Sequence, residues 1–320
     1  MPNIRLHSSF GPAIRQYGGI TVALILMCAI FSVLSPRFLQ IANFLNIIQQ
    51  VTVVAIAAFG MTYVILMGEI DLSIGSIIAV AGMTAAQCFV FGFGVLPTVL
   101  ITLLAGLVMG GINGVLVAKL NLPSFIVTLA TMGIFRGLVS LPTGGLPQQI
   151  ENDTWLGIAS ERYLGLPILI WVLLILFAAN HFLLSRTVFG RRAYLAGGNR
   201  EAAMYSGIRV DRLKITIFML SGLMAAISGI LLSSRLSSAQ TNAGMSYELD
   251  AIASAVLGGT SLTQGGTGTM IGTLMGALVI GVINNGMNML SVPYFYQLIV
   301  KGLVILVAIW LDIRNKRVRA

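Results

Sequence analysis

Long apolar stretches, separated by short polar segments, follow one another through most of this sequence. A helix needs about 20 apolar residues to cross the hydrocarbon core of a bilayer. We predict spans at residues 17–34, 44–67, 74–91, 96–117, 123–141, 167–184, 215–234, 249–262, 268–290 and 295–312. The chain is 57% hydrophobic and 9% charged, whereas soluble domains contain about 25% charged residues. The sequence therefore predicts an all-α membrane protein, with residues 1–320 forming one transmembrane domain.

Basic residues set the expected topology. The segment 185–214 carries seven basic residues against two acidic ones, and the tail 314–319 is also basic. Under the positive-inside rule, both regions lie in the cytoplasm with Arg5 and Arg15. Ten crossings satisfy this condition, so we expect ten spans, both termini in the cytoplasm and an uncleaved first span. The net charge of +9 then belongs to membrane topology and does not indicate a nucleic-acid partner.

The longest predicted outer loop, residues 142–166, contains two prolines and three acidic side chains. Such a periplasmic or extracellular loop is long enough to fold over the outer mouth and touch a soluble partner, or it is a simple connector. Trp155, Trp171 and Trp310 fall near span ends, where aromatic side chains often lie at the membrane interface.

A weak internal repeat is visible. Glu69-Ile70-Asp71 precedes one apolar run and Glu248-Leu249-Asp250 precedes another; Asn113 and Asn284 occupy similar later positions, each followed by a proline and a further span. The predicted topology relates spans 2–5 and 7–10 as an inverted repeat, a common plan in transporters. Chance similarity in a sequence rich in glycine and isoleucine is the competing explanation.

Two spans carry glycine at every fourth position: Gly106, Gly110 and Gly114, and then Gly268, Gly272 and Gly276. Small residues at this spacing allow helices to pack closely in lipid, so we interpret these faces as packing surfaces and not as ligand sites.

Polar residues inside spans are costly unless they are paired or hydrated. Asp71, followed by Ser73, is placed to cap the third span, and we favour that role over substrate contact; Asp250 could cap the eighth span in the same way. A group of asparagines either bonds between helices or lines a translocation path: Asn113, Asn284, Asn285 and Asn288.

The sequence has no phosphate-binding loop, no metalloprotease motif and no serine-hydrolase motif. With two histidines, it also offers little for a metal centre. We therefore expect a transport protein and not an enzyme. An ion-coupled carrier would use Asp71 or Glu69, an importer would need a separate ATPase, and a membrane scaffold would carry no flux.

The cytoplasmic segment decides between these classes. Glu201-Ala202-Ala203, with Gly207 four residues later, is similar to the coupling motif of ATP-binding-cassette importer permeases. Together with stretches 70–76, 196–199, 247–253 and 256–261, it makes residues 35–312 resemble the monosaccharide (ribose-type) importer permease family. Glu69 departs from the family pattern, which has a small residue there.

This resemblance implies two copies of the permease in the bacterial inner membrane, lipid around them, a cytoplasmic ATPase that binds ATP and magnesium, and a periplasmic sugar-binding protein. The chain itself would hold no cofactor or metal. Its ATPase-coupling residues would be Asn199, Arg200, Glu201, Ala202, Ala203 and Gly207, with the two alanines small enough for their helix to enter a groove. Ribose, other pentoses, hexoses and autoinducer-2 all remain open as solutes.

Overall fold

The computed structural model describes residues 10–317, and nearly all of its regular structure is helical. Among the described residues, six helices are long and apolar enough to cross a membrane. They are α1 (Phe10–Leu34), α2 (Ile41–Leu66), α4 (Val95–Lys119), α7 (Ile168–Arg186), α10 (Val210–Leu236) and α12 (Met270–Met289). The predicted class, an all-α membrane protein, is confirmed. Arg5, Val318 and Arg319, used for the topology, lie outside the described residues.

Four further helices occupy the remaining predicted spans. Three are apolar but shorter: α3 (Ile74–Val90), α5 (Ser124–Ser140) and the Tyr294–Trp310 part of α13 (Tyr294–Arg317). The fourth, α11 (Tyr247–Leu257), has 11 residues and is too short to cross a bilayer alone. Every predicted span thus contains a helix, while the number of crossings stays a prediction.

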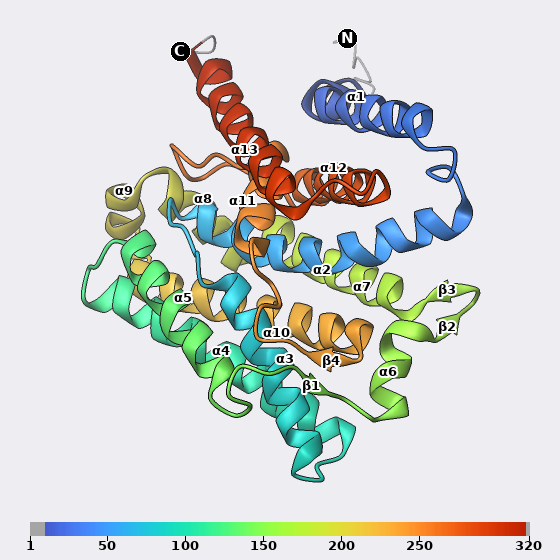
Figure 1. Ribbon diagram of the computed structural model, residues 1–320. Helices are drawn as coiled ribbons and strands as arrows, with labels where there is room; N and C mark the ends of the chain where they lie inside the picture. The colour runs from blue at the N-terminus through green and yellow to red at the C-terminus, as the bar shows by residue number, and fades with distance from the viewer. Residues whose placement is uncertain (1–9, 318–320) are drawn as a thin grey trace.

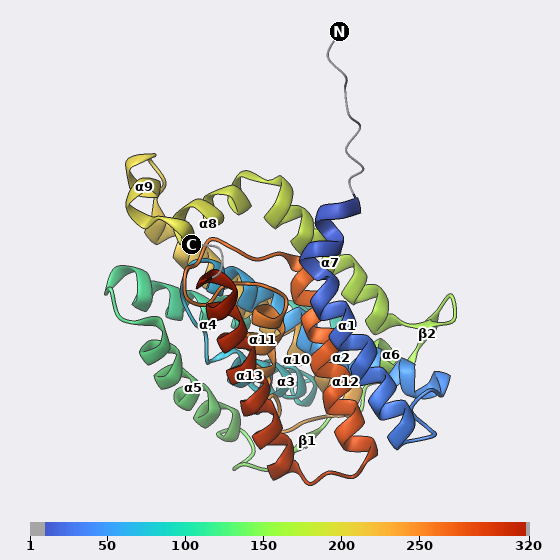
Figure 2. The ribbon, with the colours of Figure 1, turned by 90° about the horizontal axis from the view of Figure 1, so that it is seen from above.

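Helices α2 and α10 form the centre of the molecule, and the other helices pack around them (Figures 1 and 2). In both helices 67% of the apolar window is buried. The run from Val51 to Leu66 in α2 is buried at every position. Both helices are therefore largely enclosed by their neighbours.

Helices of the first half of the chain pack on helices of the second half, and the reverse. Helix α4 lies along α10, and α12 lies along α2; α3 also contacts α10, and α11 contacts α2. Helix α5 packs on α3, as α13 packs on α11. These contacts match in pairs, as a two-fold relation between spans 2–5 and 7–10 would produce.

Glycines make the closest of these contacts. A Cβ atom on Gly106 or Gly110 would collide with the backbone of Gly222 or Phe218 in α10. A Cβ atom on Gly276 would collide with the backbone of Ser254 in α11. The predicted role of the glycine series as packing surfaces is confirmed at these positions.

The segment 142–166 is folded. Strand β1 (Gln148–Gln149) pairs antiparallel with β4 (Ser238–Ala239), and α6 (Asp153–Ser160) is followed by a hairpin of β2 (Arg162–Tyr163) and β3 (Leu166–Pro167). Trp155 of α6 is fully buried, packs edge-on against Phe89 and accepts a bond from Ser234 Oγ at its carbonyl (2.7 Å). The expectation of an interfacial position for Trp155 was therefore wrong, because α6 folds inward onto α10.

Two short helices, α8 (Val188–Gly198) and α9 (Arg200–Tyr205), lie at the end of the molecule opposite the β2–β3 hairpin (Figures 1 and 2). They contain most of the basic segment that the sequence singled out.

Candidate functional site

Helix α9 is held at both ends by local bonds. Asn199 is its N-cap and accepts the Ala202 amide at 2.9 Å, while Glu201 lies in the first turn, where an acid suits the helix dipole. At the other end, Gly207 has a φ of 80°, its amide donates to Met204 O (3.0 Å), and the Ile208 amide donates to Ala203 O (3.0 Å). These two bonds form a Schellman motif. Gly207 therefore ends α9 in the left-handed conformation that glycine adopts readily.

The two alanines of α9 face opposite ways. Ala203 is 2% exposed and packs into the hydrophobic core of its own chain, whereas Ala202 lies on the outer side with Arg200 and Glu201. The sequence expected both alanines to face a partner's groove. It missed Tyr205, which is 92% exposed. The signal for Tyr205 was a large aromatic side chain within an otherwise charged segment.

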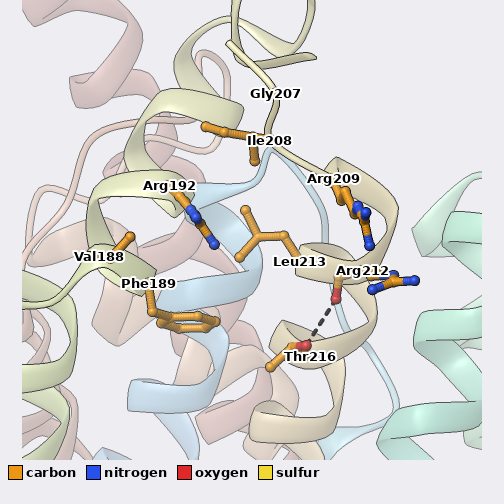
Figure 3. A pocket seen from close by; sticks show the side chains of 9 residues that line it. All are labelled: Val188, Phe189, Arg192, Gly207, Ile208, Arg209, Arg212, Leu213 and Thr216. Carbon is orange, nitrogen blue, oxygen red and sulfur yellow. Dashed lines mark hydrogen bonds between the residues drawn. The ribbon is translucent and has the colours of Figure 1, made fainter.

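A groove of about 460 Å³ lies beside α9, between α8 and the start of α10 (Figure 3). Arg192 enters it from α8, and Arg209 and Arg212 flank it from the α10 side. We call it the basic groove; its walls are completed by Val188, Phe189, Gly207, Ile208, Leu213 and Thr216. It combines an apolar floor with guanidinium groups, which suits an acidic partner segment that has an apolar side chain.

Not all basic residues of the segment point outward. Lys214 is 8% exposed and forms an ion pair and hydrogen bond with Glu69, in the turn between α2 and α3. Asp211 lies 3.9 Å from Lys119 and 4.0 Å from Arg200, both exposed pairs of small energetic weight. Glu69, the departure from the family pattern, thus has a partner inside the fold.

The glycines that precede α9 bring three backbone segments together. A Cβ atom on Gly197 would collide with Leu66 O, at the end of α2, and the Gly266 amide donates to the same carbonyl at 2.8 Å. Tyr194 of α8 donates its hydroxyl to Gly268 O at 2.7 Å. Burial raises the pKa of Tyr194, so this donor stays protonated at neutral pH. Helix α8 is therefore fixed to both α2 and the loop that follows α11.

Asp71 lies in a closed polar cluster. Its Oδ1 accepts from the Ser73 amide (3.0 Å) and the Ser73 hydroxyl (2.6 Å), and its Oδ2 accepts from Ser221 Oγ of α10 (2.9 Å). Asn113 of α4 donates to Ser73 Oγ at 2.8 Å. Asp71, Ser73 and Asn113 are fully buried. Asp71 bonds the N-cap residue of α3 and not the first helical amides, and it also links α3 to α10.

Asp250 takes a different position. The N-cap of α11 is Ser246, and Asp250 lies one turn inside the helix. Its Oδ2 accepts from Lys301 Nζ of α13 (2.8 Å) and from Asn284 Nδ2 of α12 (3.2 Å). The carboxylate thus joins three helices, in place of the cap predicted for it.

These side chains line a polar cavity of about 260 Å³ between α2, α10, α11, α12 and α13. We call it the polar cavity; its lining residues are Gln50, Val54, Arg235, Tyr247, Asp250, Gly281, Asn284, Asn288, Gln297 and Lys301. The four asparagines lie in two different kinds of surroundings. Asn284 and Asn288 line the cavity, whereas Asn113 bonds to Ser73 and Asn285 donates to Asn43 (3.0 Å), between helices.

Buried polar clusters inside a helical bundle, with a capped and exposed helix at one end, suit a membrane permease. The chain belongs to the family described as "Branched-chain amino acid transport system / permease component", which matches residues 43–309. It is 45% identical to the ribose import permease protein of Haemophilus influenzae, over 91% of each chain. It is 46% identical to the Bacillus subtilis ribose import permease (93% of each chain) and 38% identical to the xylose transport system permease protein of Escherichia coli (88% of this chain, 87% of that one). No solved structure matches.

Membership of this family makes the chain a multi-pass protein of the bacterial cytoplasmic membrane and a transport subunit.

Proposed function

We propose that the chain is the transmembrane subunit of an ATP-driven importer, and that its solute is a monosaccharide such as ribose or a related pentose. The observation that carries the proposal is the exposed helix α9, which is capped at both ends, in a chain nearly half identical to ribose import permeases. Gly197, just before α9, contacts the backbone of Leu66 and Gly266. ATP and magnesium would be bound by a separate ATPase chain.

The proposed topology has ten crossings with both termini and α9 in the cytoplasm. Helix α11 and the loop 258–269 form the eighth crossing, as a half-helix followed by irregular backbone enclosed in protein. The exchanged packing of α4 on α10 and α12 on α2 supports an inverted repeat of spans 2–5 and 7–10.

In the proposed cycle, a binding protein delivers the solute to the end of the molecule formed by α6 and the β2–β3 hairpin. ATP binding closes the ATPase dimer on α9, and acidic side chains of the ATPase meet the arginines of the basic groove. Movement of α9 passes through α8 to the Leu66 and Gly266 contacts, and so to α2 and α11.

Two permease copies would surround one path. Helices α5 and α13 expose large apolar side chains, among them Leu129, Leu138, Ile299 and Leu306, which a second copy or lipid must cover.

Reconstitution tests the proposal. Proteoliposomes that contain the permease, the ATPase and ATP inside should take up D-ribose or D-xylose only when the loaded binding protein is outside. Uptake by the permease alone, driven by a proton or sodium gradient, would favour an ion-coupled carrier instead. Uptake of autoinducer-2 but of neither pentose would keep the importer and change its solute.

A further inference from the structure

The two halves of the chain carry comparable acidic clusters, and the one around Asp250 opens onto the polar cavity. Asp71 is closed in by Ser73, Asn113 and Ser221. Asp250 faces the polar cavity, and Lys301 and Asn284 bind its Oδ2 there. If Pro123 is aligned with Pro293, as in the sequence repeat, Thr131 of α5 occupies the position of Lys301. The first half therefore has no lysine at the position that corresponds to Lys301.

The cavity side chains keep hydrogen-bonding capacity that the fold does not use. Asn284 donates its Nδ2 to Asp250, while its buried Oδ1 has no hydrogen-bond partner within residues 10–317, and the same holds for the Oδ1 of Asn285 outside the cavity. A buried amide oxygen without a partner costs free energy. The Lys301 ammonium has three donors, of which the bond to Asp250 uses one.

The size and composition of the cavity fit a small polyol. Eight of its ten lining residues have polar side chains, and Val54 and Gly281 are the exceptions. Its volume of about 260 Å³ is below the range of about 300–1,000 Å³ typical of sites for drug-sized ligands. Sugar hydroxyls donate and accept at once, so neighbouring hydroxyls match a carboxylate, an amide oxygen and an ammonium that lie side by side.

We infer that the polar cavity is a transient monosaccharide-binding site within the permease, in which Asp250 and Asn284 accept bonds from sugar hydroxyls and Lys301 donates one. The inference rests on the proposed import function and names the place in the membrane where the solute is held. In the proposed topology, the start of α11, the start of α13 and the end of α10 all lie in the outer half, so the cavity is on the side from which the sugar arrives.

The test uses the complete reconstituted importer with D-ribose as the probe and two adjacent asparagines as a matched pair. Asn284→Ala removes an amide that lines the cavity, whereas Asn285→Ala removes an amide outside the cavity, where it donates to Asn43. We expect Asn284→Ala to lower the uptake rate about three- to tenfold, the equivalent of one hydrogen bond. Asn285→Ala should change uptake less, and both should keep ATP hydrolysis that responds to loaded binding protein.

A second measurement separates binding from structure. Lys301→Met should lower D-ribose uptake, while the amount of folded permease in the membrane should equal that of the Asn285→Ala variant. Saturation-transfer NMR on the purified full-length permease should detect D-ribose contact in the parent protein and lose it in Asn284→Ala. Equal uptake and equal NMR contact for all variants would overturn the site and leave the importer intact. Absence of ATP-driven uptake by the parent complex would instead overturn the proposed function.

Discussion

Lys214 of α10 donates to Glu69, 145 residues earlier in the chain, and both side chains are largely buried. The pair joins the start of α10, next to the basic groove, to the turn that leads into α3 and the Asp71 cluster. The sequence segment richest in positive charge is thus anchored to the first half of the bundle by its single lysine.

Glu69→Gln should destabilise the permease, because it leaves a mostly buried ammonium without its counter-charge. We expect a loss of about 1–3 kcal/mol, measured as a lower thermal midpoint in detergent. Glu201→Gln is the control, since Glu201 is an exposed acid in the basic segment that contains Lys214. Combining Glu69→Lys with Lys214→Glu should recover part of the loss. An unchanged midpoint in Glu69→Gln would show that the pair does not contribute.

The neighbouring glycines 197 and 198 form a second matched pair. A methyl group on Gly197 would collide with Leu66 O, whereas a Cβ atom on Gly198 meets nothing within 4 Å. Gly197→Ala should therefore displace α8 and reduce both ATPase assembly and uptake, while Gly198→Ala should have little effect. Co-purification of the ATPase and uptake into proteoliposomes measure this difference. Equal behaviour of the two variants would remove the Gly197 contact from the mechanism.

The alanines of α9 should respond differently to a large side chain. Ala203→Trp overfills a buried position, which costs about 1–3 kcal/mol or more, so it should lower the amount of folded permease. Ala202→Trp adds bulk on the exposed side and should leave folding normal while it blocks ATPase association. Size-exclusion profiles report folding, and pull-down of the ATPase reports association. Normal ATPase binding by Ala202→Trp would mean that this face of α9 is not a contact.

The topology can be tested with two exposed glutamates. Cysteine is introduced at Glu151 or Glu201 after Cys28 and Cys88 have been replaced. An impermeant maleimide should label Glu151→Cys in intact spheroplasts and Glu201→Cys only after permeabilisation. Labelling of both from outside would contradict the ten-crossing arrangement.

The positions of the helices could be predicted because bilayer thickness sets their length and lipid demands apolar side chains. The Gly207 turn could also be predicted, since it depends on local backbone conformation. The pairing of Lys214 with Glu69 could not, because no local pattern indicates a contact between such distant residues.

The sequence also could not distinguish adjacent residues of the same type. Asn284 lines the cavity, whereas Asn285 bonds to Asn43 of α2. Ala202 and Ala203 differ because α9 has 6 residues, too few for a sequence period to reveal its buried side. Trp155 lies near a span end in sequence, but its burial depends on how α6 folds back onto α10.

The contact of Gly197 with Leu66 and Gly266 bears on how the two halves of the bundle move. No side chain separates the three backbone segments, so α8 has little room to move relative to the end of α2 in the first half and the loop after α11 in the second. We therefore expect a displacement of α8 to act on both halves of the bundle together.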